Sequence, residues 1–407
     1  MVLKNVKKFD WVILLYLMIL LIIGVTAIFS SSATKIGDNL TIKNYYLKQI
    51  IWIVISLLFM LIIIKIPYHI IEILIVPAYI ISLIFLIIVF FLPAINGSHR
   101  WIKFGFFQFQ ASEVAKLSTI LVISKAICKQ HQSTWKIMFK TMLIGILPFL
   151  LILFEPDLGT SLIFLISILT ILSVSDVPIY LLILLISPFF SIIFSFSWIY
   201  FVIYLLLLSF IFIKMKVTYL IIAFSGIFNT FIFLITPFFW NHLKFYQQNR
   251  ILTFLDPSKD PFGAGYQIIQ SKIAIGSGGI FGKGFLEGTQ KNLNFLPENH
   301  TDFIFSVIGE EFGFFGCVIL LLFYFLFLFR ILRNIELLKR REKRYATVGI
   351  VSYLSFQIFI NIGMNIGIVP ATGIPLPFIS YGGSNLLINL IAVGLILKYI
   401  NERSVFE

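Results

Sequence analysis

Long apolar runs, each about the length that crosses a bilayer as a helix, dominate the chain. A transmembrane helix needs roughly 20 consecutive apolar residues, whereas the strands of an outer-membrane barrel alternate over about ten. Because these runs are far longer than ten residues, they predict α-helices whose backbone groups bond within each helix. The first six predicted spans lie at about 11–29, 49–65, 70–92, 112–128, 137–154 and 159–175.

The second half of the chain contains six further predicted spans. Residues 177–239 are almost continuously apolar, and Pro188, the stretch 195–198 and the basic cluster 214–216 divide them into three spans. A long polar segment follows at 241–302. The last three spans are predicted at about 303–329, 346–368 and 384–400, which makes twelve in total. The predicted fold class is therefore all-α: a polytopic transmembrane helical protein with a long external loop.

Composition supports this class and excludes others. The chain is 59% hydrophobic and 12% charged, where a soluble domain averages about 45–50% apolar and 25% charged. Its formal net charge of +13 does not indicate nucleic-acid binding, because the basic residues flank apolar runs instead of forming a basic face on a soluble module. Cys128 and Cys317 lie in or beside apolar runs, so we expect neither a disulfide nor a zinc cluster.

The distribution of lysine and arginine predicts the orientation in the membrane. If the N-terminus is cytoplasmic, the basic stretches 125–140, 214–216 and 330–344 all face the cytoplasm, as the positive-inside rule requires. The segment 241–302 is then external, and an even number of spans returns the C-terminus to the cytoplasm. The run at 11–29 is too long for the core of a signal peptide and is followed by more spans, so we expect it to be the first span.

Four external segments gather polar side chains at the outer membrane surface. In the first, the loop around Arg100 and Trp101 carries three basic residues against the positive-inside trend, which suggests that they hold an anion. Ser112 is predicted to cap the next helix, in which Glu113 and Lys116 share one face. The alternative is that Arg100 reaches lipid headgroups and Trp101 is an interfacial aromatic residue.

The second segment is the turn Glu155-Pro156-Asp157. Pro156 ends one helix, and Asp157 is placed either to cap the next helix or to bind a ligand.

The third segment, at 250–284, combines dense glycines with Arg250, Lys272 and Lys283. Glycine permits close approach of backbone N–H groups, which together with the lysines could cradle a phosphate. No Walker pattern is present, and a plain flexible loop is the alternative.

The fourth segment carries His300 and Asp302 at the outer end of a span, with Glu310 and Glu311 two turns into it. Acids inside a membrane are costly and are functional candidates by default. The alternative for Glu310 and Glu311 is pairing with basic groups on neighbouring helices. For Asp302 it is capping of the helix N-terminus.

Taken in this order, the four segments resemble the SEDS family of shape, elongation, division and sporulation proteins. The matching motifs are AIGSGGIFGKG, FLPENHTDFIF and PLPFISYGGS, and the resemblance spans nearly the whole chain. SKIAIGSGG with GKGFLEGTQ is more similar to the elongation branch than to the division branch. The resemblance implies one membrane domain over residues 1–407, acting as a peptidoglycan glycosyltransferase that polymerises lipid II outside the cytoplasmic membrane.

The resemblance also implies partners and residue roles. We expect contacts with lipid II, a class B penicillin-binding protein, the cell-elongation machinery and membrane lipids, and none with nucleic acid. The family's essential acid corresponds to Asp302. With the residues singled out above, the candidate substrate-binding set is Arg100, Trp101, Glu113, Lys116, Asp157, Arg250, Lys272 and His300.

Two departures from the family pattern are visible. Relatives often carry Gln where this chain has Glu155, which adds a carboxylate without an assigned role. Family members usually have ten spans against the twelve predicted here, and the surplus lies at about 177–215. Because two added spans preserve parity, the loop 241–302 stays external.

The implied reaction is consistent with these side chains. A sugar 4-hydroxyl attacks an anomeric carbon with inversion, so one carboxylate must accept the hydroxyl proton, and we expect this to be Asp302. The pyrophosphate departs as an anion and needs cations, for which Arg100 and Lys116 are candidates, with Arg250 and Lys272. A divalent cation such as Mg²⁺ or Mn²⁺ could share this task, but no side-chain cluster specifies one.

Two other classes of function compete with the polymerase. A lipid II flippase would use the same charges, but it should place polar residues near the membrane midplane and show inverted repeats, and neither is seen. A purely structural scaffold leaves Arg100, Lys116 and Asp302 unexplained.

Overall fold

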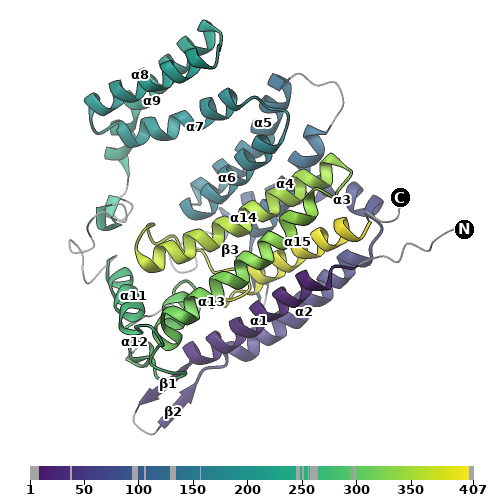
Figure 1. Cartoon of the computed structure of the whole chain (residues 1–407), viewed down its shortest axis with the longest axis vertical. Coiled ribbons are helices and arrows are strands. Elements are labelled where there is room, and N and C mark those ends of the chain that lie inside the picture. Colours follow the sequence, from purple (N-terminus) through teal and green to yellow (C-terminus); the bar gives the residue numbers. More distant parts are fainter. Residues whose placement is uncertain are drawn as a thin grey trace, which may run out of the picture.

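The computed structural model of the chain is a bundle of long helices with two small hairpins (Figure 1). It describes residues 9–36, 39–93, 100–104, 107–128, 134–155, 157–243, 248–249, 252–254, 256, 265–293, 295–296 and 299–402.

Within these residues, twelve helices coincide with the twelve predicted spans, which confirms the polytopic helical fold. Eight of them are long and apolar enough to cross a membrane, three are shorter apolar helices, and the helix at 111–127 falls in neither group. The twelve are α1 (Trp11–Ser32), α2 (Tyr45–Lys65), α3 (Tyr68–Val89), α4 (Ala111–Ile127), α5 (Thr134–Phe154), α6 (Leu158–Val174), α7 (Ile179–Phe194), α8 (Trp198–Lys214), α9 (Tyr219–His242), α13 (Ile304–Ile335), α14 (Arg341–Ile366) and α15 (Gly383–Asn401). Two shorter helices, α11 (Tyr266–Ser277) and α12 (Thr289–Asn292), lie in the segment before α13.

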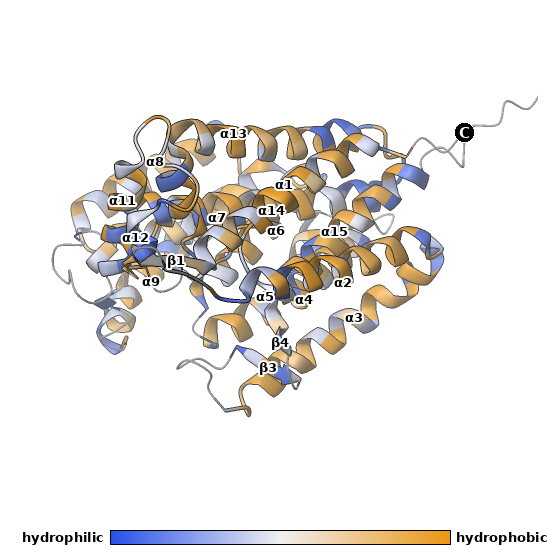
Figure 2. Cartoon of the chain, turned by 90° about the horizontal axis from the view of Figure 1, so that it is seen from below, coloured by the Kyte–Doolittle hydropathy of each residue, from blue (hydrophilic) through white to orange (hydrophobic). Residues whose placement is uncertain are grey.

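The helices divide into buried and lipid-facing ones. In the most apolar stretch of α15, 83% of the residues are buried, and in that of α14 72% are, against 11% in α9. The pairs α2 with α15, α6 with α14, α3 with α4 and α1 with α13 pack together. Figure 2 shows that apolar residues predominate along the helices and that hydrophilic residues concentrate near helix ends and in the connections. The core therefore lies around α14 and α15.

Two antiparallel hairpins connect helices at one end of the bundle. β1 (Ala33–Ile36) pairs with β2 (Asn39–Ile42), and β3 (Trp101–Phe104) pairs with β4 (Phe107–Gln110). Because β4 runs directly into α4, the extended residue Gln110 occupies the N-cap position. The prediction that Ser112 caps this helix is therefore wrong. Ser112 lies inside the first turn, and its buried hydroxyl has no hydrogen-bond partner in the structure.

The glycine-dense segment packs into a break in α13. Gly313 interrupts the helix with φ 64° and ψ −160°. Backbone N–H groups of Lys283 and Gly284 donate to the carbonyls at 310 and 311, each at 3.0 Å. A Cβ at Gly278 would overlap the backbone of α13. We expect these glycines to allow a close backbone approach, and in the structure it is the backbone of α13 that they approach.

The predicted surplus region, 177–215, contains α7 and α8, which pack with α9 as a three-helix unit beside α5 and α6 (Figure 1). A buried polar cluster joins the three helices. The Asn229 amide donates to the Ser187 hydroxyl at 3.0 Å and accepts from the Ser191 hydroxyl at 2.6 Å. The Tyr204 hydroxyl of α8 donates to the Ser187 carbonyl at 2.7 Å. In a membrane, such hydrogen bonds fix which apolar faces meet.

We expect Asn229→Leu to destabilise the three-helix unit. Leucine fills a similar volume but leaves the serine hydroxyls without their amide partner, at a cost of about 1–2 kcal/mol for a hydrogen-bonded membrane cluster. The measurement is the unfolding midpoint of the purified protein in detergent. Thr230→Val is the matched control, because the Thr230 hydroxyl bonds to the Gly226 carbonyl of its own helix. Equal losses in both variants would contradict a role for the cluster.

Candidate functional site

Arg100 and Asp157 form one side of a polar region where α5 ends and α6 begins. Asp157 caps α6 by accepting from the Thr160 N–H at 3.1 Å, which confirms the predicted cap. Its other oxygen lies 3.7 Å from the Arg100 guanidinium. Arg100 also donates to the Glu155 carbonyl at 3.2 Å. Capping uses only one of its oxygens, so the other is left for Arg100, and the ligand-binding role stays a prediction.

The hairpin β3–β4 borders this region. Trp101 pairs with Gln110 across the hairpin. The Gln110 amide lies 3.5 Å from the Asp157 oxygen that also faces Arg100. The Ser384 hydroxyl of α15 donates to the Gln108 carbonyl at 2.8 Å. Trp101 is thus half-buried, and it lies at the same end of the hairpin as Gln110, which contacts Asp157.

Glu113 and Lys116 form a buried ion pair in the first turns of α4. The two charged groups lie 2.9 Å apart, and both side chains are almost fully buried. Asn385 of α15 donates to the second Glu113 oxygen at 3.2 Å, and the Lys116 amine lies 5.7 Å from the centre of the Tyr353 ring. A buried pair is stable only when such additional partners satisfy both ions. The predicted shared face of α4 is confirmed by this contact.

Asp302 lies in a turn whose backbone is held by side chains from α14. Its carbonyl accepts from the Asn361 amide at 2.9 Å and from the Asn365 amide at 3.1 Å. The Ser380 hydroxyl donates to the Thr301 carbonyl at 2.6 Å. Helix α13 begins at Ile304 with Phe303 at its N-cap position, so Asp302 lies one residue before it. The capping role considered for its carboxylate stays a prediction.

The segment 372–374 connects Asp302 with the Asp157 region. Gly373 has φ 73°, and a Cβ placed there would lie 3.5 Å from an Asp302 carboxylate oxygen. On the other side, a Cβ at Gly159 would lie 2.8 Å from the Thr372 side chain. Asp157 and Asp302, 145 residues apart in sequence, therefore flank the same short segment.

His300 lies beside the turn that holds Asp302. Its ring stacks on Tyr45 of α2, with centroids 4.2 Å apart, and its carbonyl accepts from the Tyr381 N–H at 2.9 Å.

Lys272 lies in α11, which docks on the end of α14. Ser271 donates to the Asn365 carbonyl at 2.8 Å. The Lys272 side chain lies so close to Gly367, which ends α14 with φ 75°, that a Cβ there would overlap it. Asn365 thus contacts both α11 and the Asp302 turn. Arg250 lies outside the described residues.

The two acids inside α13 are paired with lysines of the segment that precedes it. Glu310 accepts from the Lys283 amine and the Thr289 N–H, each at 2.8 Å. Glu311 pairs with the fully buried Lys291, and the Ser30 hydroxyl donates to it at 2.7 Å. Pairing with basic groups was the alternative considered for these acids. The lysines come from a loop and from α12, not from neighbouring spans.

The family comparison matches almost the entire chain. The FtsW/RodA/SpoVE cell cycle protein family matches residues 10–204 and 194–404. The chain belongs to this family. This confirms the family assignment made from the motifs.

Similar proteins from this family extend over the full chain length. The peptidoglycan glycosyltransferase MrdB of Escherichia coli K12 is 35% identical, covering 98% of this chain and 95% of that protein. The peptidoglycan glycosyltransferase RodA of Treponema pallidum is 34% identical, covering 98% and 99%.

Two solved structures share the architecture. A chain of a peptidoglycan synthase complex that coordinates polymerization and crosslinking superposes with a TM-score of 0.72, at 28% identity over 97% of this chain and 98% of that one. The rod shape determining protein RodA of Thermus thermophilus superposes with a TM-score of 0.64 at 23% identity, over 97% and 98%. The latter likeness concerns the fold.

Sequence reasoning missed the amides that support this region. Asn361, Asn365 and Asn385 bond to Asp302 or Glu113, and the sequence analysis gives none of them a role. A usable signal existed, because asparagine inside an apolar span is costly without a partner.

A metal role stays a prediction. Among the described residues, no group of three or more His, Cys, Asp or Glu side chains is arranged to hold a metal ion.

Glu155 is a buried carboxyl in the turn between α5 and α6. It is 1% exposed, and neither side-chain oxygen has a hydrogen-bond partner among the described residues. Burial, together with the negative charge of Asp157, raises its pKa to about 8, although Arg100 acts in the opposite direction. Glu155 is therefore mostly protonated at neutral pH and adds no full negative charge beside Arg100.

We expect Lys291→Met to destabilise the protein by about 3–5 kcal/mol, because it leaves Glu311 buried without its cation. The measurement is the unfolding midpoint in detergent. Lys283→Met is the matched control, since Glu310 keeps the backbone N–H groups of Thr289 and Gln290. Adding Glu311→Gln to Lys291→Met should restore part of the loss. Equal effects of the two lysine variants would contradict the importance of the buried pair.

We expect Glu155→Gln to change how stability depends on pH. An unfolded glutamate releases its proton near pH 4.5 and the folded one near 8, so the folded state holds an extra proton between these values. Wild-type stability should therefore fall as pH rises from about 4.5 to 8, with on the order of a few kcal/mol from this group. The variant should lack that contribution and gain relative stability across the window. Parallel curves of unfolding midpoint against pH would contradict the raised pKa.

Proposed function

We propose that this chain is a peptidoglycan glycosyltransferase that polymerises lipid II during cell elongation. Full-length relatives at 34–35% identity are peptidoglycan glycosyltransferases. The single observation that carries the proposal at residue level is the arrangement of Asp302 and the Arg100–Asp157 pair around the segment 372–374. The reaction needs a carboxylate and a cation, and Asp302 and Arg100 are the candidates on the two sides of this segment.

Asp302 acts in this proposal as the general base. The acceptor sugar hydroxyl must lose its proton as it attacks the anomeric carbon, and a positioned carboxylate accepts that proton. Hydrogen bonds from Asn361 and Asn365 fix the backbone carbonyl of Asp302. The amides therefore support the turn that carries the proposed base.

Cations act on the leaving group. The pyrophosphate departs as an anion, so positive charge placed where that charge develops stabilises the transition state. Arg100 is the best-placed described candidate, because its guanidinium is partly exposed and lies 3.7 Å from Asp157. Lys116 is buried against Glu113, which balances its charge, so it is less available to the pyrophosphate than Arg100. Lys272 is exposed and could meet the phosphates from the side of α11.

The proposed orientation has both termini in the cytoplasm and the Asp302 region at the external face. The basic residues at the opposite end of the bundle support this orientation through the positive-inside rule. The polar candidates gather at one end of the spans, which favours a surface reaction over a flippase with a midplane site.

A class B penicillin-binding protein is the proposed partner. The related structure at 28% identity belongs to a complex that coordinates polymerization and crosslinking. Crosslinking is a second reaction, and a transpeptidase of this class would supply it.

We expect Asp302→Asn to abolish lipid II polymerisation while the protein stays folded. The amide has the same size but does not accept a proton at neutral pH, and loss of a general base typically costs about 10²–10⁴-fold in rate. The measurement is glycan-strand formation from labelled lipid II by the purified protein, with and without its partner.

Asp176→Asn is the matched control, because this exposed aspartate pairs with Arg341 at the opposite end of the bundle. It should retain nearly full activity. An Asp302→Asn variant with more than about a tenth of the wild-type rate would require another base. If the wild-type protein moved lipid II across vesicles without forming glycan, the flippase would replace the polymerase.

A further inference from the structure

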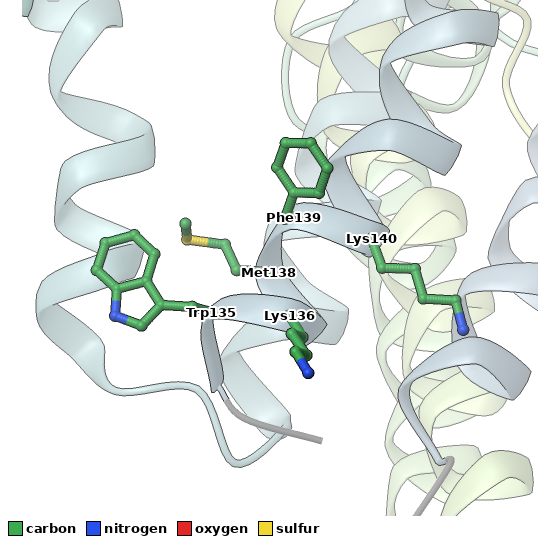
Figure 3. Close-up of a pocket in the computed structure, with 5 residues that line it drawn as sticks. All are labelled: Trp135, Lys136, Met138, Phe139 and Lys140. Carbon is green, nitrogen blue, oxygen red and sulfur yellow. The ribbon is translucent and has the colours of Figure 1, made fainter.

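A cavity at the beginning of α5 combines aromatic and cationic side chains at a membrane interface. It has a volume of about 780 Å³ and is lined by Trp135, Lys136, Met138, Phe139 and Lys140 (Figure 3). The cavity is wide open along one side of α5, and its lining is mostly apolar. None of these residues contributes to the candidate site.

The position of the cavity relative to the bilayer follows from the length of α5. The helix has 21 residues, so it rises by about 31 Å, close to the thickness of the hydrocarbon core. Its far end leads to Glu155 and the Arg100–Asp157 pair. The cavity therefore lies at the membrane surface opposite the candidate site.

The side chains around the cavity are arranged as in an interfacial site. Trp135 is 46% exposed and Phe139 is 70% exposed. Figure 3 shows the Phe139 ring pointing along the helix toward its middle, while the amines of Lys136 and Lys140 point toward the beginning of the helix. The apolar groups are thus at the level of acyl chains, and the amines are at the level of headgroup phosphates.

The two lysines differ from other basic residues at this end of the bundle. Within the part of the chain that the structure describes, neither Lys136 nor Lys140 forms an ion pair. Three basic residues at the same end have carboxylate partners: Lys125 with Glu72 at 3.6 Å, Arg341 with Asp176 at 2.8 Å and Lys343 with Glu402 at 2.7 Å. Lys136 and Lys140, one helical turn apart, therefore offer two uncompensated charges beside an apolar cavity.

We propose that this cavity binds an anionic phospholipid of the leaflet opposite the candidate site. The phosphate lies between the Lys136 and Lys140 amines, and an acyl chain lies against Trp135, Met138 and Phe139. Charge complementarity selects the lipid, since a zwitterionic headgroup carries its own cation and gains less from two lysines. The proposal is independent of the glycosyltransferase activity.

The test is lipid titration of the purified full-length protein, followed by native mass spectrometry. The probes are phosphatidylglycerol and phosphatidylcholine with identical acyl chains. We expect phosphatidylglycerol to bind at least tenfold more tightly. Substitution K136Q/K140Q should weaken phosphatidylglycerol binding by about thirtyfold, as expected for two lysines near a membrane surface, and K136R/K140R should restore it.

The control is K214Q/K216Q, which removes two lysines from the exposed end of α8 and its following turn, away from the cavity residues. It should leave the affinity within about threefold of wild type. Wild-type affinity in K136Q/K140Q would overturn the proposal, as would equal binding of the two lipids, which would indicate a purely apolar site. Displacement by millimolar inorganic phosphate would show a free-anion site instead of a lipid site.

Circular dichroism of each variant shows whether the variant is folded, so that a loss of binding can be separated from a loss of folding. If K136Q/K140Q does not fold, binding by K136R/K140R is the deciding measurement.

Discussion

Charges buried among apolar helices must meet opposite charges and hydrogen-bond donors, and the polar part of this structure is arranged around that requirement. Glu113 meets Lys116, Glu310 meets Lys283, and Glu311 meets Lys291. Each ion would be strongly destabilising alone. Two of the three pairs also join a loop to α13, so the same interactions that neutralise the acids hold the segment 283–291 against the bundle.

The amides of α14 and α15 extend this arrangement to the candidate site. Asn361 and Asn365 face the backbone of Asp302, and Asn385 faces Glu113. All three are buried in helices of the core, where packing allows little side-chain movement. Groups with proposed chemical roles are therefore supported by rigid spans, although they themselves lie in turns and at helix ends.

The sequence was sufficient to locate the spans, because a membrane helix needs only a local run of apolar residues. It was also sufficient for the Asp157 cap, which depends on its immediate neighbours. Local reasoning failed at Ser112, since the hairpin preceding α4 determines where that helix begins. The helices α14 and α15 are less apolar than the lipid-facing α9, which favours their burial. The sequence does not show which helices surround them, because that depends on distant segments. The contact of Gly373 with Asp302 also depends on distant segments and has no local signature.

The break at Gly313 divides α13 into two mechanically distinct parts. The piece from Ile304 to the break carries Asp302 just before it, and at the break its carbonyls are bonded to the backbone at 283–284. Beyond the break, Phe314 donates to the carbonyl of Gly279 at 2.9 Å. The segment 279–284 therefore bridges both pieces of α13 across the break. Through these bonds, a displacement of that segment would be passed to the long piece and to the short piece that follows Asp302.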